Sequence, residues 1–184
     1  MDKKQIRADV IEKRRMLSDE ERMEKSVRIL KKLDKQDAFL KAWKVALYAS
    51  DDREVITYPL INRAQFLDKG VSFPKVTSND QKEMTFLYVL SVSDLKPGFK
   101  GILEPDASAT VMERPDLIIM PLVAFDPNRN RIGQGGGYYD RYLKEHPDIF
   151  TIALAFECQK VDRIPAEEWD IRPNMIITEN SIYE

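Results

Sequence analysis

Hydrophobic and polar positions follow a helical period near the N-terminus. Residues 2–17 are mostly polar with a thin apolar stripe, which predicts an amphipathic helix. Ser18 and Glu21, in the sequence S-D-E-E, form a capping-box signal, so a second helix is expected to begin there and to run to about Leu33. We therefore expect a helical pair over about residues 2–34, followed by a short helical turn.

Further along the chain, short apolar runs predict the strands of a sheet. The longest run, residues 117–125, is almost continuously apolar, which is typical of a strand covered on both faces. Helices are expected over residues 57–68, where Pro59 is tolerated near the first turn, and over residues 138–146. Segment 91–114 is expected to be irregular. The remaining strands are expected at 45–49, 71–76, 84–90, 149–156 and 175–178.

Strands that alternate with helices indicate an α/β fold with a mostly parallel sheet and helices on both faces. The 184 residues have the length of about one domain. A single α/β domain over residues 1–184 is therefore expected, with the N-terminal helical pair packed on it. In such sheets, ligands bind beyond the carboxyl ends of the strands. The loops expected to carry function are 49–57, 125–138 and 156–170.

Composition excludes several classes of protein and of site. Hydrophobic residues make up 43% and charged residues 33%, as in globular proteins, and the net charge of −2 disfavours nucleic-acid binding. A single cysteine, Cys158, and a single histidine, His146, exclude an intramolecular disulfide, a cysteine-based zinc site and a multi-histidine metal centre. With no apolar run of membrane-spanning length and a polar N-terminus, we expect a cytoplasmic protein that binds neither nucleic acid nor a membrane.

Charge is distributed unevenly along the chain. Residues 1–35 carry 12 Lys and Arg against 8 Asp and Glu, which leaves 17 against 23 for the remaining residues. A basic arm of net charge +4 on a body of net charge −6 suits an anionic ligand. A solvated amphipathic helix pair has the same pattern, so charge alone does not decide between the two.

A cluster of glycines is the main anomaly of the composition. Gly133, Gly135, Gly136 and Gly137 follow a buried strand and lead into a helix at about Tyr138. Glycines let backbone N–H groups approach a ligand closely, and a helix N-terminus adds free N–H groups, so the pattern suits a phosphate. It is neither a Walker A loop nor a good dinucleotide fingerprint. A tight strand-to-helix turn would explain the same glycines.

The residues that flank the glycines favour a phosphate site. Arg131 and Arg141 bracket the loop, and guanidinium groups match phosphate oxygens in fork geometry. Asp140 lies in the first helical turn, where it either complements the helix dipole or binds Mg²⁺. Tyr138 and Tyr139 offer flat faces for a heteroaromatic ring, although one of them is expected to pack inward.

A long motif in this region resembles a known family. F-D-x-x-x-x-R-x-G-x-G-x-G-Y-Y-D-R-x-L, from Phe125 to Leu143, is similar to the signature of 5-formyltetrahydrofolate cyclo-ligases, also called 5,10-methenyltetrahydrofolate synthetases. The resemblance extends over nearly the whole chain. It includes K-K-Q-I-R at Lys3–Arg7 followed by Arg14, E-V-I-T at Glu54–Thr57, A-L-A-F at Ala153–Phe156 and D-I-R-P-N-M-I-I-T at Asp170–Thr178.

The resemblance implies a fold and a reaction. The fold is a three-layer α/β sandwich of the type shared with ribose-5-phosphate isomerase and CoA-transferase-like domains, which agrees with the strand and helix pattern. The reaction is the ATP- and Mg²⁺-dependent conversion of 5-formyltetrahydrofolate to 5,10-methenyltetrahydrofolate, with release of ADP and phosphate. In it, the formyl oxygen is phosphorylated and N10 of the folate then attacks. The partners implied are therefore ATP and a small-molecule folate.

The same resemblance implies which residues bind ATP and act in catalysis. The glycine loop carries no lysine, and a basic residue of some relatives is replaced by Gly136, so cations are expected from elsewhere. Catalytic roles are expected for Arg7, Arg131 and Tyr138. The expected ATP-binding residues are Lys3, Lys4, Arg7, Arg131, Gly133, Gln134, Gly135, Gly136, Gly137, Tyr138 and Tyr139. Taken singly, the lysines and arginines of this set are equally consistent with solvated surface charge.

Folate and metal residues follow from the resemblance in the same way. Substrate contacts are expected from Ser50, Glu54, Gln134 and Tyr138, where the Glu54 carboxylate accepts from the amide N–H and the amine of the pterin. Asp140 and Asp170 are the expected Mg²⁺ ligands, although Trp169 stands where relatives often have histidine. Met84 and Phe86 either line a pocket or pack in the core, His146 is expected to end a helix, and Cys158 is expected to have no role.

Two other functions remain open at this point. One is a different ATP-dependent enzyme that shares the glycine loop and the metal carboxylates but uses another acceptor. The other is a binding module without catalysis, which the number of charged groups around the loop disfavours. Either a monomer or a homodimer is consistent with the sequence.

Overall fold

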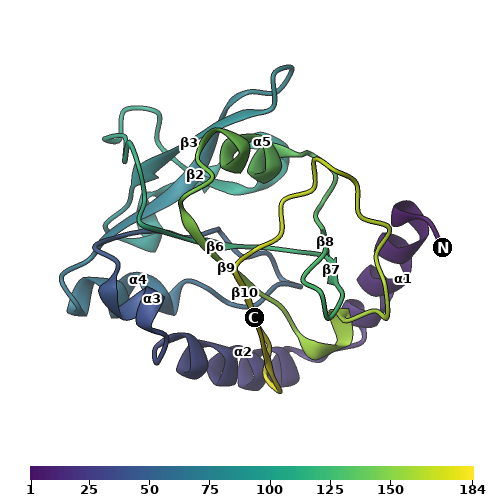
Figure 1. Ribbon diagram of the computed structural model, residues 1–184. Coiled ribbons are helices and arrows are strands. Elements are labelled where there is room, and N and C mark those ends of the chain that lie inside the picture. The colour runs from purple at the N-terminus through teal and green to yellow at the C-terminus, as the bar shows by residue number, and fades with distance from the viewer.

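The computed structural model describes residues 1–184 apart from the side chain of Lys100. Its centre is a seven-stranded sheet in the order β11-β10-β9-β6-β1-β2-β3, seen nearly edge-on in Figure 1. The five inner strands are parallel, and the edge strands β3 and β11 are antiparallel to their neighbours. The strands are β1 Lys44–Ala46, β2 Gly70–Ser78, β3 Glu83–Tyr88, β6 Leu117–Met120, β9 Phe150–Leu154, β10 Met175–Ile177 and β11 Ile182–Tyr183.

Helices cover both faces of this sheet. Three of them, α2, α3 and α4, lie on one face, and α5 lies on the other (Figure 1). Two separate apolar clusters join the layers, one around Leu33, Phe39 and Ile119 and one around Phe86 and Leu143. The mostly parallel α/β fold predicted from the sequence is confirmed. The helices are α1 Lys3–Arg15, α2 Asp19–Leu33, α3 Asp37–Lys41, α4 Pro59–Phe66 and α5 Tyr138–Glu145.

The capping box predicted at the start of α2 is confirmed. The main-chain N–H of Glu21 donates to Ser18 Oγ (3.1 Å), and the N–H of Ser18 donates to Glu21 Oε2 (2.9 Å). The two bonds satisfy amide groups that a helix leaves without partners at its first turn. Local sequence therefore sets where α2 begins.

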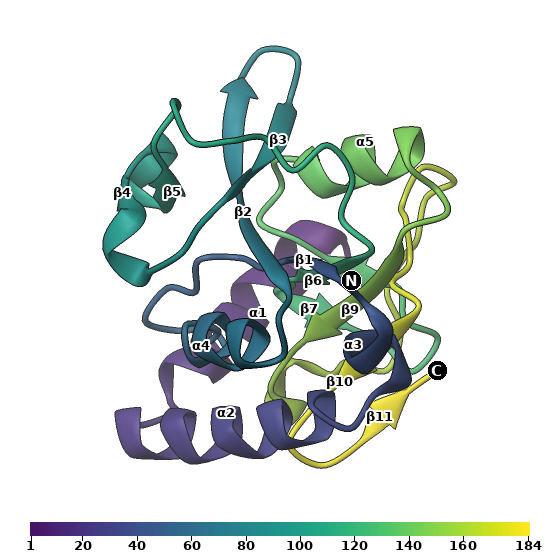
Figure 2. The ribbon, with the colours of Figure 1, turned by 90° about the vertical axis from the view of Figure 1, so that its left-hand side faces the viewer.

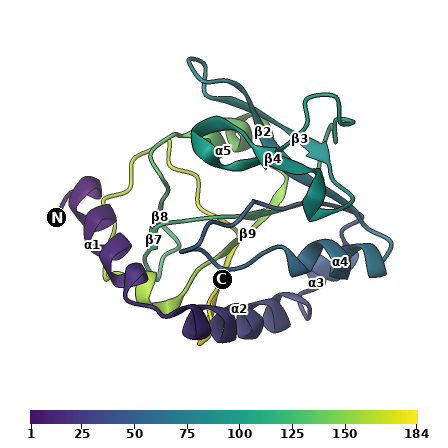
Figure 3. The ribbon, with the colours of Figure 1, turned by 180° about the vertical axis from the view of Figure 1, so that it is seen from behind.

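The first helix does not lie on the sheet beside α2. Its apolar residues Ile6 and Val10 pack with Val123, Ile132 and Ile164, in a cluster of their own. Ile132 belongs to, and Val123 adjoins, a short antiparallel ribbon of β7 (Ala124–Phe125) and β8 (Arg131–Ile132). Figures 1 and 3 show α1 beside this ribbon, away from α2. The side chain of Arg7 on α1 is thereby placed next to the glycine loop that follows β8.

The single strand predicted over residues 117–125 is wrong. The chain leaves the central sheet after β6, and Ala124–Phe125 instead pairs with β8. Pro121 has no N–H to continue a ladder. The buried Asp126 carboxylate then closes the ribbon turn, accepting from the N–H groups of Asn128 and Asn130 at 2.9 and 3.0 Å. Apolar content alone did not reveal this break.

Smaller elements complete the fold. Segment 91–114 contains a second short ribbon, so it is not wholly irregular, and the β2–β3 hairpin projects beyond the sheet beside α5 (Figure 2). Among the described residues, no helix is both long and apolar enough to cross a membrane. The elements are η1 Val92–Asp94, β4 Leu95–Pro97, η2 Phe99–Gly101, β5 Leu103–Pro105 and η3 Glu157–Gln159.

Candidate active site

The topology of the sheet marks one position for a ligand. Strands β1 and β6 are neighbours, but the chain continues from β1 to β2 on one side and from β6 to β9 on the other. The loops that leave the carboxyl ends of β1 and β6 therefore diverge, and a crevice is expected where they separate. Residues 47–58 leave β1, and residues 121–137, which include the β7–β8 ribbon and the glycines, leave β6.

The glycine loop is built around two backbone requirements. Gly137 is the N-cap of α5 and has a φ of +74°, in the left-handed region that glycine adopts without strain. A Cβ atom at Gly136 would lie 2.7 Å from the ring of Tyr138, so a side chain there would displace this ring. No side chain caps the helix start. Its first N–H groups are consequently available to an anion.

Three cationic side chains surround this loop. Arg7 Nε donates to the carbonyl oxygen of Gly133 (2.9 Å), and a Cβ at Gly135 would lie 3.7 Å from its Nη2. A Cβ at Gly133 would be 3.5 Å from Arg131 Nη1, and one at Gly137 would be 3.9 Å from Lys82 Nζ. Arg7 and Arg131 were predicted at this place. Lys82 was not, because it comes from the turn between β2 and β3.

The β2–β3 turn is tied to the glycine loop. Tyr138 donates its hydroxyl hydrogen to Asn79 Oδ1 (2.8 Å), and its ring meets the ring of Phe99 edge-on at 6.0 Å. Lys82 itself has a φ of +55°, which is rare for a residue with a side chain. The projecting hairpin in Figure 2 therefore brings Lys82 to the start of α5.

Arg131 and Asp140 form an ion pair behind the loop. Arg131 Nη2 lies 2.7 Å from Asp140 Oδ1, and only 5% of the arginine side chain is exposed. The main-chain N–H of Ile171 donates to the same carboxylate oxygen (3.1 Å), and Arg131 Nε donates to the Ile171 carbonyl (3.1 Å). These bonds join α5 to the loop that contains Asp170.

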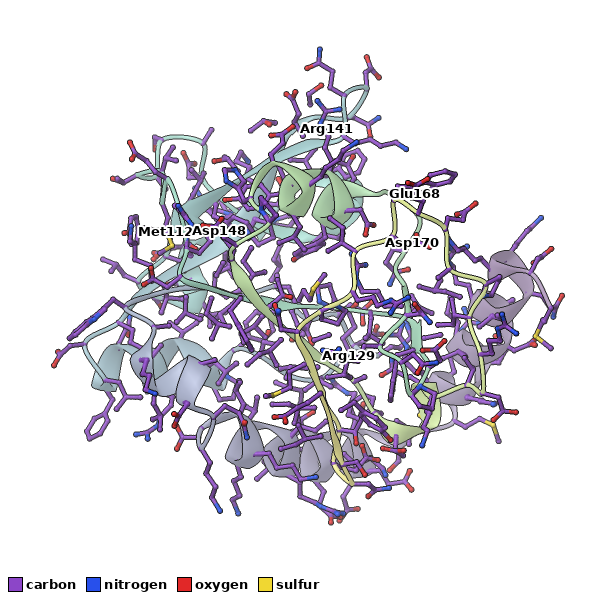
Figure 4. All side chains as sticks on the ribbon, in the orientation of Figure 1. Met112, Arg129, Arg141, Asp148, Glu168 and Asp170 are labelled. Carbon is purple, nitrogen blue, oxygen red and sulfur yellow. The ribbon has the colours of Figure 1, made fainter. Side chains whose placement is uncertain are left out.

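Asp170 is paired with a cation from the first helix. Its Oδ2 accepts from Lys3 Nζ (2.6 Å) and from the main-chain N–H of Glu167 (2.7 Å). Figure 4 shows Asp170 on the loop that runs between α5 and α1. Lys3 thus contacts a carboxylate and not the glycine loop. Lys4 is exposed, and among the described residues no hydrogen bond or ion pair joins it to that loop.

Asp140 accepts from the main-chain N–H of Ile171, and Asp170 precedes Ile171 in the chain, so the two expected Mg²⁺ ligands adjoin one loop. The described residues contain no group of three or more His, Cys, Asp or Glu side chains placed to hold a metal. Mg²⁺ needs no such group, because one or two carboxylates, waters and substrate phosphates complete its shell. Each carboxylate is already held by a cation. The pair fits Mg²⁺ that arrives together with a phosphate.

Glu54 lies at the other end of the site, buried to 8% exposure. Its Oε2 accepts from the main-chain N–H of Asp51 (3.1 Å), and the nearby Gln134 side chain favours the ionised form of the carboxylate. Burial, and then the negative charge of Asp51, raise the pKa of Glu54 from 4.5 to about 7. Glu54 and Gln134 therefore meet across the loops that follow β1 and β6, as the folate assignment of both residues requires.

Ser50 is fixed within its own loop. Its Oγ accepts from the main-chain N–H of Thr57 (3.2 Å), and Tyr58 donates its hydroxyl hydrogen to the Ser50 carbonyl (2.9 Å). These bonds shape the loop that carries Glu54. Ordinary loop chemistry accounts for Ser50, and a substrate contact remains a prediction.

The two adjacent tyrosines point to different surroundings. Tyr139 packs against the apolar cluster under α5, where burial and the Glu54 carboxylate raise its pKa above the usual range. Tyr138 faces Asn79 of the hairpin turn. Both rings are half-buried against this cluster, so the expectation that one of them packs inward does not distinguish the two. Arg141 lies on α5 (Figure 4), where it pairs with Glu83 and Glu145 instead of the glycine loop.

Other candidate residues have structural places. Met84 and Phe86 are buried in the core on the α5 side of the sheet, so packing explains both. His146 is the C-cap of α5, and its ring lies 4.5 Å from that of Tyr142. Cys158 is half-buried in the free thiol form.

One buried group entered the sequence analysis only as part of the family resemblance, without a role. Arg14, at the end of α1, is only 3% exposed, and its Nε and Nη1 have no hydrogen-bond partner among the described residues. Its spacing of seven from Arg7, two helical turns, was the available signal, because it places both arginines on one face of α1. Lys82 had no such signal.

Comparison with known proteins places the chain in a family. Residues 1–179 match the model of the 5-formyltetrahydrofolate cyclo-ligase family. The chain is 32% identical to the 5-formyltetrahydrofolate cyclo-ligase of Escherichia coli strain K12 over 178 residues, which cover 94% of this chain and 98% of that protein. It is 35% identical to the Haemophilus influenzae protein of that name over 132 residues, which cover 69% and 71% of the two chains.

Solved structures agree with the sequence matches. The NMR structure of 5,10-methenyltetrahydrofolate synthetase from Aquifex aeolicus aligns with a TM-score of 0.86 and 34% identity, covering 100% of this chain and 93% of that one. A 5,10-methenyltetrahydrofolate synthetase from Mycoplasma pneumoniae aligns with a TM-score of 0.78 and 27% identity over 97% and 99% of the chains. The predicted resemblance is confirmed: this chain is a ligase that belongs to the 5-formyltetrahydrofolate cyclo-ligase family.

Proposed function

We propose that the protein converts 5-formyltetrahydrofolate to 5,10-methenyltetrahydrofolate, with ATP as the second substrate and Mg²⁺ as the cofactor. The observation that supports this most is the proximity of the buried Glu54 carboxylate to Gln134 of the glycine loop. It joins a buried carboxylate, suited to the pterin ring, to the phosphate-type loop of Gly133–Gly137. A phosphate donor and a folate would therefore meet between β1 and β6.

The phosphate end of the site would hold ATP. The uncapped start of α5 offers N–H groups, and Arg7, Arg131 and Lys82 bring positive charge to the loop. Phosphoryl transfer depends mainly on positioning and charge neutralisation, which these groups supply. Asp140 and Asp170 would hold Mg²⁺, which when bound neutralises phosphate charge. Lys3 and Arg131 keep the two carboxylates in place before ligands bind.

The reaction itself is a phosphoryl transfer followed by ring closure. The formyl oxygen attacks the terminal phosphate of ATP, and ADP leaves. N10 then attacks the formyl carbon, the carbon–oxygen bond breaks, and phosphate leaves as the N10 proton is lost. An amide-type oxygen is a weak nucleophile, so holding it in line with the phosphate is the main task of the protein. Arg7, Arg131 and Tyr138 are placed around the loop to do this.

Glu54 would orient the folate. Its ionised carboxylate accepts two hydrogen bonds from the amide N–H and the amine of the pterin, and charged acceptors make the stronger bonds. Gln134 and Ser50 lie beside it, on the loops after β6 and β1. The raised pKa of Glu54, about 7, implies that folate binding weakens below this pH.

One absorbance assay tests the proposed function. The protein is mixed with 5-formyltetrahydrofolate, ATP and Mg²⁺, and the near-ultraviolet absorbance of the conjugated methenyl product is followed, with ADP measured in parallel. We expect a rise that needs all three components and one ADP for each methenylfolate. If ADP forms with other acceptors but not with this folate, a different ATP-dependent enzyme is the answer. If ligands bind and neither product forms, the protein is a binding module.

A further inference from the structure

The segment that carries Glu54 has no regular secondary structure. Residues 47–58 link β1 to α4 and belong to neither a helix nor a strand. A buried main-chain group without a partner is costly, so a segment of this kind needs side chains to bind its amide and carbonyl groups. The side chains that do so therefore determine where the Glu54 carboxylate lies.

Two of these side chains come from α2. Ser26 Oγ accepts a hydrogen bond from the main-chain N–H of Ile56 (3.1 Å). One turn earlier, Arg22 Nη1 donates to the carbonyl oxygens of Asp51 (3.5 Å) and Glu54 (3.4 Å). Residues four positions apart lie on the same face of a helix. One face of α2 thus holds both ends of the segment that runs from Asp51 to Ile56.

Ser26 stands where an apolar residue would be expected. It is only 2% exposed, and it lies on the face of α2 that packs into the core through Ile29 and Leu33. Alanine at this position would favour the helix more and would bury no polar group. The bond from the Ile56 N–H explains the hydroxyl, because without it this amide would lose its acceptor. The hydroxyl therefore serves the loop and not the helix.

The loop also makes hydrogen bonds within itself. Tyr48 donates its hydroxyl hydrogen to the Val55 carbonyl (3.1 Å), and Ser50 Oγ accepts from the Thr57 N–H (3.2 Å). These bonds join residues of the same loop, so they shape it without attaching it to another element. The bonds from α2 attach the loop to a separate element, and they do so at and beside Glu54.

We propose that Ser26 and Arg22 are positioning residues of the folate subsite, which hold the Glu54 carboxylate where it accepts from the pterin. The proposal rests on the proposed function, because Glu54 is assigned there to the folate. A group that is held in its binding position before the ligand arrives loses less freedom when the ligand binds. Loss of either bond should therefore weaken folate binding and leave ATP binding unchanged.

Ser26→Ala tests the first bond. It leaves the Ile56 N–H without its acceptor, so we expect the KM for 5-formyltetrahydrofolate to rise about tenfold, in the lower part of the range for such a loss, with the KM for ATP unchanged. Ser26→Thr, which retains a hydroxyl, should restore most of the folate affinity. Ser72→Ala is the matched control, because Ser72 is also buried but its hydroxyl donates to Met112 Sδ and not to this loop.

Arg22→Met tests the second bond and keeps the apolar stem of the side chain. The bonds of Arg22 are long, so we expect a rise of only about threefold in the KM for the folate. Lys31→Met, which removes the same charge from an exposed position of α2, is the control. Arg22→Met leaves the buried Ser26 in place, so it decides the question if thermal unfolding shows that Ser26→Ala does not fold. An equal rise in the two KM values, or an unchanged KM for the folate, overturns the proposal.

A second measurement does not depend on activity. Hydrogen exchange of the Ile56 amide is followed by NMR in the ligand-free protein. We expect it to be about tenfold faster in Ser26→Ala than in the wild type and unchanged in Ser72→Ala. Equal rates in all three proteins overturn the proposal. The proposed function fails separately, if the wild type forms no methenylfolate from 5-formyltetrahydrofolate, ATP and Mg²⁺.

Discussion

The two ends of the candidate site differ in how their charges are arranged. At the phosphate end, each carboxylate has a cation in direct contact: Asp140 with Arg131 at 2.7 Å and Asp170 with Lys3 at 2.6 Å. At the folate end, the Glu54 carboxylate is buried and has no ion-pair partner among the described residues. The phosphate end is organised by close pairs. The folate end depends on the Glu54 carboxylate, whose pKa of about 7 leaves it partly protonated near neutral pH.

This difference suits the two ligands. A phosphate brings several negative charges, so its site must hold cations and metal carboxylates in fixed positions without mutual repulsion. A pterin is neutral and is recognised through hydrogen bonds, for which one ionised acceptor suffices. Binding at the phosphate end should therefore not depend on pH near neutrality. Binding at the folate end should depend on it. Three variants test this comparison in four predictions.

Asp140→Asn should have the largest effect. It removes the charge that holds Arg131 and one expected ligand of Mg²⁺, so we expect turnover to fall about 100-fold, the upper range for loss of a metal-site partner. The requirement for Mg²⁺ should move to higher concentration in a Mg²⁺ titration of turnover. Glu145→Gln, an exposed change at the other end of α5, is the control. Wild-type turnover and Mg²⁺ dependence in Asp140→Asn would remove this residue from the metal site.

Glu54→Gln should act on the folate alone. Loss of hydrogen bonds to a charged acceptor costs about 1.5–3 kcal/mol, which predicts a rise of about 10- to 100-fold in the KM for 5-formyltetrahydrofolate. The KM for ATP should change little. Steady-state kinetics with each substrate varied measures both, and Asp52→Asn, in the same loop and 83% exposed in its side chain, serves as control. A larger effect on ATP than on folate would contradict the pterin assignment.

The same variant should change how stability depends on pH. The pKa of Glu54 is about 7 in the folded protein and 4.5 in the reference state, so the folded protein binds the proton more tightly. The stability from the neutral form is fully present below pH 4.5 and is lost as pH rises through 7, by about 3 kcal/mol. Urea unfolding at pH 5 and pH 8 should show this loss in the wild type and in Asp52→Asn, but not in Glu54→Gln. Parallel curves for all three proteins would refute it.

Lys82→Gln should have the smallest effect. The side chain is exposed, and its Nζ lies 3.9 Å from the position of a Cβ at Gly137, so its attraction for phosphate is partly screened. We expect a rise of about threefold in the KM for ATP, which becomes smaller at high salt, with folate unaffected. Lys144→Gln, an exposed change on α5 but far from the start of this helix, is the control. An unchanged KM for ATP at low salt would exclude Lys82 from the phosphate end.

Local signals in the sequence predicted part of this structure. The S-D-E-E capping box placed the start of α2, and alternating apolar runs predicted a mostly parallel sheet, because both depend on residues close together in the chain. The glycines before Tyr138 likewise predicted a turn into a helix. The prediction of one strand over 117–125 was wrong because it rested on the apolar run alone. That run gives no sign that the ladder stops at Pro121 or that the chain turns at the buried Asp126.

Contacts between distant segments could not be predicted in the same way. Arg7 reaches Gly133 because α1 packs on the β7–β8 ribbon, 126 positions away, and Lys82 reaches Gly137 because a long hairpin projects beside α5. The burial of Arg14 depends on the packing of several elements at once. The residue types of the site could be predicted from the sequence, because the chemical groups belong to the side chains themselves. Their pairing, burial and charge state depended on the folded arrangement, since those properties belong to neighbours and to excluded water.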